Sequence, residues 1–133
     1  MIDPPPGFSP LEDPGPFLEL VGPVLARDDE IPFTLGLRVE ERHLNAAGTA
    51  QGGLLATLAD FALGRAVRAR ADDARSATVS LTTDYLGPVQ VGEWVEARTE
   101  VERLGGRLAF ADCSLRVGQR EVVRARAVFA VLG

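Results

Sequence analysis

The sequence is poor in the residues that form disulfides, metal sites and proton-transfer pairs. Its 133 residues include one cysteine, Cys113, and one histidine, His43. A single cysteine excludes an intrachain disulfide. Because no cluster of cysteines and histidines is present, a dedicated transition-metal site is not expected. We predict neither a metal nor another cofactor.

Lysine is also absent, so all 14 basic residues are arginine, and the net charge is −5. An acidic chain is a poor match for sequence-independent binding to nucleic acid, which requires a basic face. The longest nearly apolar run, 54–63, is about half the roughly 20 residues of a membrane span and contains Asp60. The N-terminus lacks a signal-peptide pattern. We therefore expect a cytoplasmic protein that acts on a small molecule and binds neither nucleic acid nor membrane.

Hydrophobic residues make up 46% of the chain and charged residues 25%, which is typical of one globular domain. Six of the nine prolines lie in residues 1–16, so we expect an extended or loose leader there. A single domain would then occupy 17–133. Apolar spacing predicts a short amphipathic helix over 17–26, although Gly22 and Pro23 disfavour it.

Period-two alternation of apolar residues predicts half-buried strands. In the first, Phe33, Leu35, Leu37 and Val39 would face the core. In the strand that ends at Gly87–Pro88, we expect the core face to carry Val79, Leu81, Thr83 and Tyr85, and the opposite face to carry Thr78, Ser80, Thr82 and Asp84. The predicted strands cover about 33–40, 78–85, 94–104, 108–117 and 121–132.

A long helix rich in leucine and alanine is predicted over Leu54–Arg70, opened by Gly52–Gly53 and preceded by a turn at Asn45–Gly48. It is apolar on nearly every side, so it must be buried nearly all round. An antiparallel sheet wrapped around the helix would bury it most simply. The predicted fold class is α+β, with five to six antiparallel strands around one long central helix.

Asp60 is the unexpected residue of that helix, because no other charge lies between Gln51 and Arg65. At helical spacing it shares one stripe of small or polar residues with Gly53, Thr57 and Gly64. An unpaired carboxylate in apolar surroundings costs several kcal/mol or has a raised pKa. The stripe therefore indicates either a ligand-binding groove or a close helix contact across a dimer, in which a partner chain's donors cap the acid.

Gln51-Gly52-Gly53 starts the same helix. Two glycines allow a ligand to approach the backbone, and the first N–H groups of a helix have no intrahelical acceptor. Such a terminus can polarise a carbonyl or hold an oxyanion. By itself Gly-Gly is a weak signal that also fits a flexible loop, but here it precedes Asp60 by seven residues.

These residues resemble the hotdog thioesterases of the phenylacetic-acid-pathway (PaaI-like) type. That family's pattern has Asn, then His-Gly-Gly six residues later, then Asp nine residues after the His. The matching segments are Asn45, Gln51-Gly52-Gly53 and Asp60, the strand 77–88, Val91-Gly92-Glu93 and the turn 104–107. The similarity covers about 30–132. The one departure is Gln51 in place of the family's His, since Gln can hydrogen-bond but cannot carry a proton.

The resemblance implies an acyl-CoA thioesterase whose site is shared between two subunits. Asp60 of one chain would face Gln51, Gly52 and Asn45 of the other, and would act as general base or as nucleophile. The Gly52 N–H would polarise the thioester carbonyl. Asn45 and Thr78 match positions that hold the water or the carbonyl. A homodimer or a dimer of dimers is expected.

Substrate contacts are predicted at Gly53 and at Arg103 and Arg107, which flank the Gly105–Gly106 turn and could meet CoA phosphates. Arg124 and Arg126, on one strand face, are weaker candidates. We interpret His43 as a surface or hairpin residue and Cys113 as a core residue rather than a nucleophile.

Three alternatives remain open at this point. Gln51 favours a protein that binds acyl-CoA without cleaving it. A hotdog hydratase or dehydratase would require an Asp/His pair, and the single histidine precedes the helix motif. A purely structural dimerisation domain would gain stability from Asp60→Ala.

Overall fold

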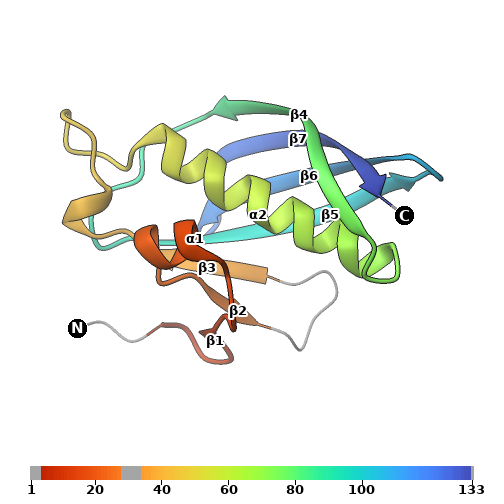
Figure 1. The fold of residues 1–133 in the computed structure, drawn as a ribbon. Helices are drawn as coiled ribbons and strands as arrows, with labels where there is room; N and C mark the ends of the chain where they lie inside the picture. Colours follow the sequence, from red (N-terminus) through yellow and green to blue (C-terminus); the bar gives the residue numbers. More distant parts are fainter. Residues whose placement is uncertain (1–3, 28–33, 133) are drawn as a thin grey trace.

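The computed structural model describes residues 4–27 and 34–132, and in this part of the chain one long helix, α2 (Gly52–Arg70), crosses one face of a seven-stranded antiparallel sheet (Figure 1). The order of the strands is β1-β2-β3-β5-β6-β7-β4. They comprise β1 (Ser9–Pro10), β2 (Leu25–Arg27), β3 (Thr34–Arg38), β4 (Arg75–Tyr85), β5 (Trp94–Leu104), β6 (Leu108–Val117) and β7 (Arg120–Leu132). The predicted hotdog fold is confirmed: β3 to β7 are the five predicted strands, and β1 and β2 extend one edge.

The leucines and alanines of α2 favour a helix intrinsically, and one face of α2 packs on the sheet. Its buried residues are Leu55, Leu58, Ala59, Ala62, Leu63, Ala66 and Val67. The opposite stripe, Gly53, Thr57, Asp60 and Gly64, is exposed or half-buried. The prediction that α2 is buried nearly all round is therefore wrong for the single chain, because the sheet covers only one side of the helix.

Strand β3, the first of the five predicted strands, is buried on both faces rather than one. Leu35, Leu37 and Val39 are buried as predicted, whereas Phe33 lies outside the described residues. The other face is covered by the Trp94 ring, which lies so close to Gly36 that an added Cβ would come within 2.0 Å of it. Phe8 of the proline-rich segment packs edge-on against the same ring at 5.1 Å.

The predicted helix over 17–26 is wrong beyond Val21. Helix α1 covers Pro16–Val21, and Leu25–Arg27 pairs with β3 as strand β2. The Gly22–Pro23 pair separates the two elements, because a residue that precedes proline is disfavoured in helical conformation.

His43 is buried, so its interpretation as a surface residue is wrong. It belongs to a short 3-10 helix, η1 (Glu41–His43), and its Nδ1 accepts the Glu40 N–H at 2.9 Å. Because Nδ1 accepts, the ring proton lies on Nε2, which donates to the Val21 carbonyl at the end of α1. Arg42 donates to the neighbouring Leu20 carbonyl. One partner of His43, Val21, lies in α1, and local periodicity could not identify this distant contact.

We predict that His43→Ala destabilises the fold by about 1–3 kcal/mol, because it removes a buried side chain and leaves the partly buried Glu40 N–H and Val21 carbonyl without partners. Urea unfolding measures this change. Arg98→Ala is the control, since Arg98 forms only an exposed ion pair with Glu96 at 3.6 Å and should change stability by less than about 1 kcal/mol. Equal stability of the two variants would contradict the anchoring role of His43.

Candidate active site

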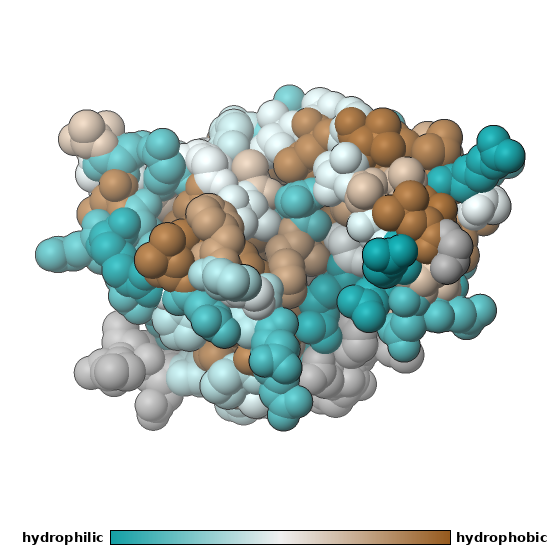
Figure 2. Space-filling view, in the orientation of Figure 1, coloured by the Kyte–Doolittle hydropathy of each residue, from teal (hydrophilic) through white to brown (hydrophobic). Residues whose placement is uncertain are grey.

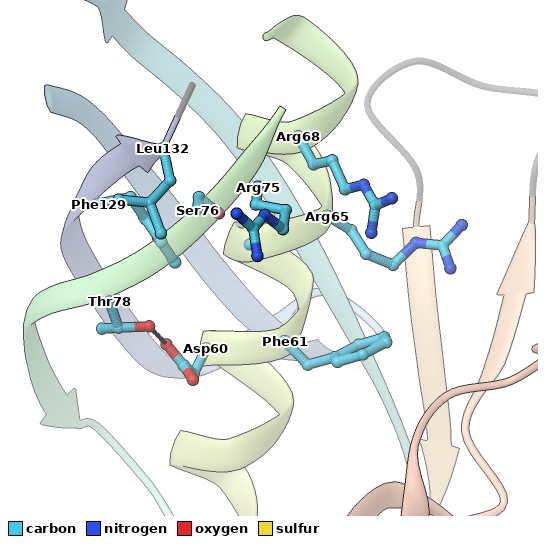
Figure 3. Close-up of a pocket in the computed structure, with 10 residues that line it drawn as sticks. Asp60, Phe61, Arg65, Arg68, Arg75, Ser76, Thr78, Phe129 and Leu132 are labelled. Carbon is cyan, nitrogen blue, oxygen red and sulfur yellow. Dashed lines mark hydrogen bonds between the residues drawn. The ribbon is translucent and has the colours of Figure 1, made fainter. Parts of the chain in front are cut away.

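Asp60 lies half-buried on the face of α2 that the sheet leaves open. The Thr78 hydroxyl of β4 donates a hydrogen bond to Asp60 Oδ1 at 2.8 Å (Figure 3). Within the described residues, Oδ2 has no hydrogen-bond partner. The predicted apolar surroundings of Asp60 are thus corrected: one carboxylate oxygen accepts a hydrogen bond from Thr78, and the residue is partly open to solvent.

A β-bulge determines where Thr78 points. Thr78 pairs with Phe129 and Ser80 with Val128, so Val79 is an extra residue in β4. Phe129 is buried on the helix side of the sheet, and Thr78 therefore shares that side with Leu81, whose partner is Ala127. The prediction that Thr78 faces away from the core is wrong, because strict alternation fails at a bulge.

A cavity of about 490 Å³ lies beside Asp60 between α2 and β4. Its apolar walls include Phe61 and Phe129, and its polar lining includes Ser76, Thr78 and three arginines, Arg65, Arg68 and Arg75. Figure 3 shows Arg75 projecting from β4 toward α2, while Arg65 and Arg68 extend from α2 on the same side as Phe61.

The start of α2 presents backbone N–H groups. Gln51 caps the helix with an extended backbone (ψ 130°), and its carbonyl accepts the Leu54 N–H at 3.0 Å. Within the described residues, the Gly52 and Gly53 N–H groups have no hydrogen-bond acceptor. A Cβ added at Gly53 would meet no atom within 4 Å, so a ligand has room to approach. The expected arrangement of a glycine-rich helix start is present.

Tyr85 supports this helix start. Its hydroxyl donates to the Gly52 carbonyl at 2.7 Å, and its ring lies against Gly52, where an added Cβ would come within 3.2 Å. Tyr85 is half-exposed, on the same face of β4 as Thr78 and Thr83. The residue was predicted to face the core but was given no role. Its signal in the sequence was that it is the single tyrosine of the chain.

Asn45 shapes the turn before α2. Its Oδ1 accepts the Ala47 N–H at 2.9 Å and the Thr49 N–H at 3.2 Å, and its Nδ2 donates to the Thr49 hydroxyl. The predicted turn is confirmed by the bond from the Gly48 N–H to the Asn45 carbonyl. In the single chain, the Asn45 side chain therefore orders the loop that leads to Gln51.

Gln51 lies at a second cavity, of about 420 Å³, between α1 and the start of α2. The wall is mostly apolar. Its apolar residues are Phe17, Val21, Leu44 and Leu54, and Arg42, His43, Gly53 and Thr57 complete it. Figure 2 shows hydrophobic surface over α1, where Phe17 and Leu20 are exposed. An apolar group of a small ligand fits this environment better than a charged one.

Asp60 and Gly52 do not meet within one chain. They are eight residues apart on the same helix, which corresponds to about 12 Å along the axis. Asp60 lines the first cavity, whereas Gln51 and Gly53, the neighbours of Gly52, line the second. A single carbonyl cannot contact both groups unless one of them comes from another chain. This separation agrees with the expectation of a shared site.

The remaining candidates lie elsewhere. Arg103 and Arg107 are exposed at the β5–β6 turn and line neither cavity. Arg124 and Arg126 form surface ion pairs with Glu121 and Asp112, at 3.2 and 3.0 Å.

Cys113 is a core residue as predicted, and burial, together with the charge of Asp112, raises the pKa of its thiol to about 12. A protonated, buried thiol is not a nucleophile.

Sequence reasoning missed the arginines of the Asp60 cavity. None of Arg65, Arg68 and Arg75 was predicted to belong to the site. The signal was the position of Arg68, eight residues or just over two turns beyond Asp60, which places both on nearly the same side of α2.

The described residues contain neither a metal-binding cluster nor a membrane-spanning helix. In the ranges 4–27 and 34–132, no group of three or more His, Cys, Asp or Glu side chains is arranged to hold a metal ion. None of the helices in those ranges combines the length and the apolar character needed to span a bilayer.

Comparison with known proteins identifies the class. Residues 47–124 match the family model described as the thioesterase superfamily. A Pseudomonas aeruginosa protein named "Putative esterase" is 44% identical over 131 residues, covering 97% of this chain and 98% of the relative. Mouse acyl-coenzyme A thioesterase 13 is 34% identical over 79 residues, covering 59% of this chain and 56% of the mouse protein.

Solved structures agree with this class. A mutant of the phenylacetic acid degradation protein PaaI from Thermus thermophilus superposes with a TM-score of 0.80 at 28% identity, over 89% of this chain and all of that one. The chain belongs to the thioesterase superfamily and is a hotdog thioesterase of the PaaI-like type.

Proposed function

We propose that this protein hydrolyses an acyl-CoA thioester to the free acid and CoA, with Asp60 as the essential carboxylate. The observation that carries the proposal is the pair of half-sites on α2: an acid held by Thr78 at 2.8 Å and, about 12 Å away along the helix, two glycine N–H groups without acceptors among the described residues. The acyl-coenzyme A thioesterase named among the relatives supports CoA as the thiol.

The reaction requires few groups. As general base, Asp60 would accept a proton from water through Oδ2 while the water oxygen attacks the thioester carbonyl carbon. The negative charge that develops on the carbonyl oxygen would be stabilised by the Gly52 N–H. When the carbonyl reforms, the C–S bond breaks and CoA leaves as a thiolate.

Asp60 as nucleophile is the second route to the same products. Oδ2 would attack the carbonyl carbon and form a mixed anhydride as the thiolate leaves, and water would then hydrolyse that anhydride. In both routes Thr78 leaves Oδ2 as the reacting oxygen.

Gln51 is compatible with catalysis because the leaving group is a thiol. An ordinary thiol has a pKa of about 8.5, so it departs as a thiolate without a strong general acid. Gln51 would position the carbonyl or the water by hydrogen bonding. Arg103 and Arg107, the predicted CoA contacts, lie at the β5–β6 turn and line neither cavity.

The site would be completed by a second copy of the chain. Asp60 of one protomer would face Gly52, Gln51 and Asn45 of its partner. Support comes from the open stripe of α2 and from β4, which is an edge strand that carries exposed Val79 and Tyr85 and is followed by exposed Leu86. An edge strand with exposed apolar residues is normally covered. A homodimer, or a dimer of dimers, follows.

The acyl group would enter the apolar cavity beside Gln51. That cavity adjoins Gly53, where the backbone is open, and its wall includes Phe17 and Leu54. A carbonyl bound at Gly52 would leave its acyl substituent beside this wall.

Binding without hydrolysis is the second candidate function, and the replacement of the family's His by Gln51 is the observation that favours it. Assays of thiol release against a panel of acyl-CoAs separate the two.

We predict that Asp60→Asn lowers the rate of hydrolysis by about 10²–10⁴-fold, because the amide can neither accept the proton nor attack.

Retained binding of acyl-CoA by Asp60→Asn, with unchanged unfolding, would show that the loss is chemical. Wild-type protein that binds acyl-CoA and releases no thiol from any member of the panel would instead establish the binding function.

The oxyanion role of Gly52 is tested by a matched pair, Gly52→Pro and Gly52→Ala. Both add a Cβ against the Tyr85 ring, but only proline removes the N–H. Proline is tolerated at the first helical position, and the extended Gln51 suits a following proline. We predict that kcat falls by about 10²–10³-fold in Gly52→Pro and within about threefold in Gly52→Ala. Equal loss in both variants would contradict the role.

A further inference from the structure

The cavity beside Asp60 carries several arginines in an otherwise acidic protein. Among the described residues, its lining includes Arg65, Arg68 and Arg75 and one acid, Asp60, whereas the whole chain has a net charge of −5. Asp60 is engaged by Thr78, Arg65 has a further partner, and Arg68 has only a loose ion pair with exposed Asp73 at 3.8 Å. Arg75 and the loosely held Arg68 are therefore the cations of this lining that can turn to an anion.

We infer that Arg68 and Arg75 form the subsite for the phosphate groups of the CoA portion, on the same chain as the Asp60 that acts on the thioester. This inference rests on the proposed function. It assigns phosphate recognition to the α2–β4 cavity instead of the β5–β6 turn at which Arg103 and Arg107 lie.

Distances along α2 and β4 favour recognition of a phosphate, which lies far from the reacting carbonyl, over recognition of an anion next to that carbonyl. Along α2, Arg68 lies about 12 Å beyond Asp60. Along β4, Arg75 lies about 10 Å from Thr78. The guanidinium groups extend further. The arm of CoA between sulfur and diphosphate is about as long as five extended residues, roughly 17 Å, so it spans from Asp60 to the arginines.

The chemistry of the lining also suits this end of CoA. Arginine binds phosphate oxygens bidentately, and such charge-assisted bonds are among the strongest at protein surfaces. Phe61 and Phe129 provide apolar walls between Asp60 and the arginines, against which the pantetheine arm would lie. Arg68 would exchange its loose contact with Asp73 for the phosphate.

The test compares the double variant Arg68→Gln/Arg75→Gln with wild type. Both side chains are exposed, so the fold should be retained. The substrates are one acyl-CoA and the same acyl group on pantetheine, which lacks phosphates. We expect KM for acyl-CoA to rise roughly tenfold with kcat unchanged, and KM for acyl-pantetheine to stay at its wild-type value. KM for acyl-CoA should also depend less on salt in the variant.

Arg98→Gln is the control, because Arg98 lies on the outer face of β5 beside Glu96, and it should leave KM unchanged. A rise in KM for Arg103→Gln/Arg107→Gln, with none for Arg68→Gln/Arg75→Gln, would overturn the subsite and place it at the β5–β6 turn. A rise confined to succinyl-CoA, with none for butyryl-CoA, would also overturn it, because the recognised anion would then be a carboxylate of the acyl group.

Binding measurements keep the subsite testable if no thioester is hydrolysed. Calorimetric titration with CoA and with pantetheine is then compared in wild type and in Arg68→Gln/Arg75→Gln. Weaker binding of CoA alone in the variant supports the subsite while the proposed hydrolysis fails. Equal CoA binding by the two proteins overturns the subsite, whatever the activity.

Discussion

The hydrogen bond from Thr78 to Asp60 joins the two elements on which the site depends. It links the open face of α2 to the edge strand β4, and it exists because the bulge at Val79 turns Thr78 toward the helix. The other face of α2 is committed to the core through residues such as Leu58 and Leu63. A helix fixed on one side by packing and on the other by hydrogen bonds from Thr78 and Tyr85 of β4 holds its carboxylate at a defined position beside the cavity.

The proposed substrate path follows from the separation of the groups along α2. The glycine N–H groups and the apolar cavity lie at its start, Asp60 lies near its middle, and the arginines lie near its end. One chain therefore presents one set of groups that suits the acyl end of the thioester and another set that suits its CoA end. Two antiparallel copies of such a helix would bring the start of one beside the middle of the other, and the reacting carbonyl would lie between them.

Much of this arrangement was predictable from the sequence, because it depends on local periodicity. The composition of Leu54–Arg70 predicted α2, and the spacing of Gly53, Thr57, Asp60 and Gly64 identified the small and polar stripe that the sheet leaves uncovered. The bulge was not predictable, since one extra residue in β4 leaves apolar alternation almost unchanged. His43 and the arginine cavity depend on contacts between distant segments, with Val21 in one case and across α2 and β4 in the other. The roles of the site residues remain predictions.

The central claim is that each site combines Asp60 of one chain with Gly52 of another, and complementation tests it most directly. Asp60→Asn and Gly52→Pro chains, each nearly inactive alone, would be coexpressed so that they pair at random. About half of the dimers would then be mixed, and each would hold one intact site of two. The account predicts recovery of about a quarter of wild-type activity. A mixture no more active than the average of its parents would contradict it.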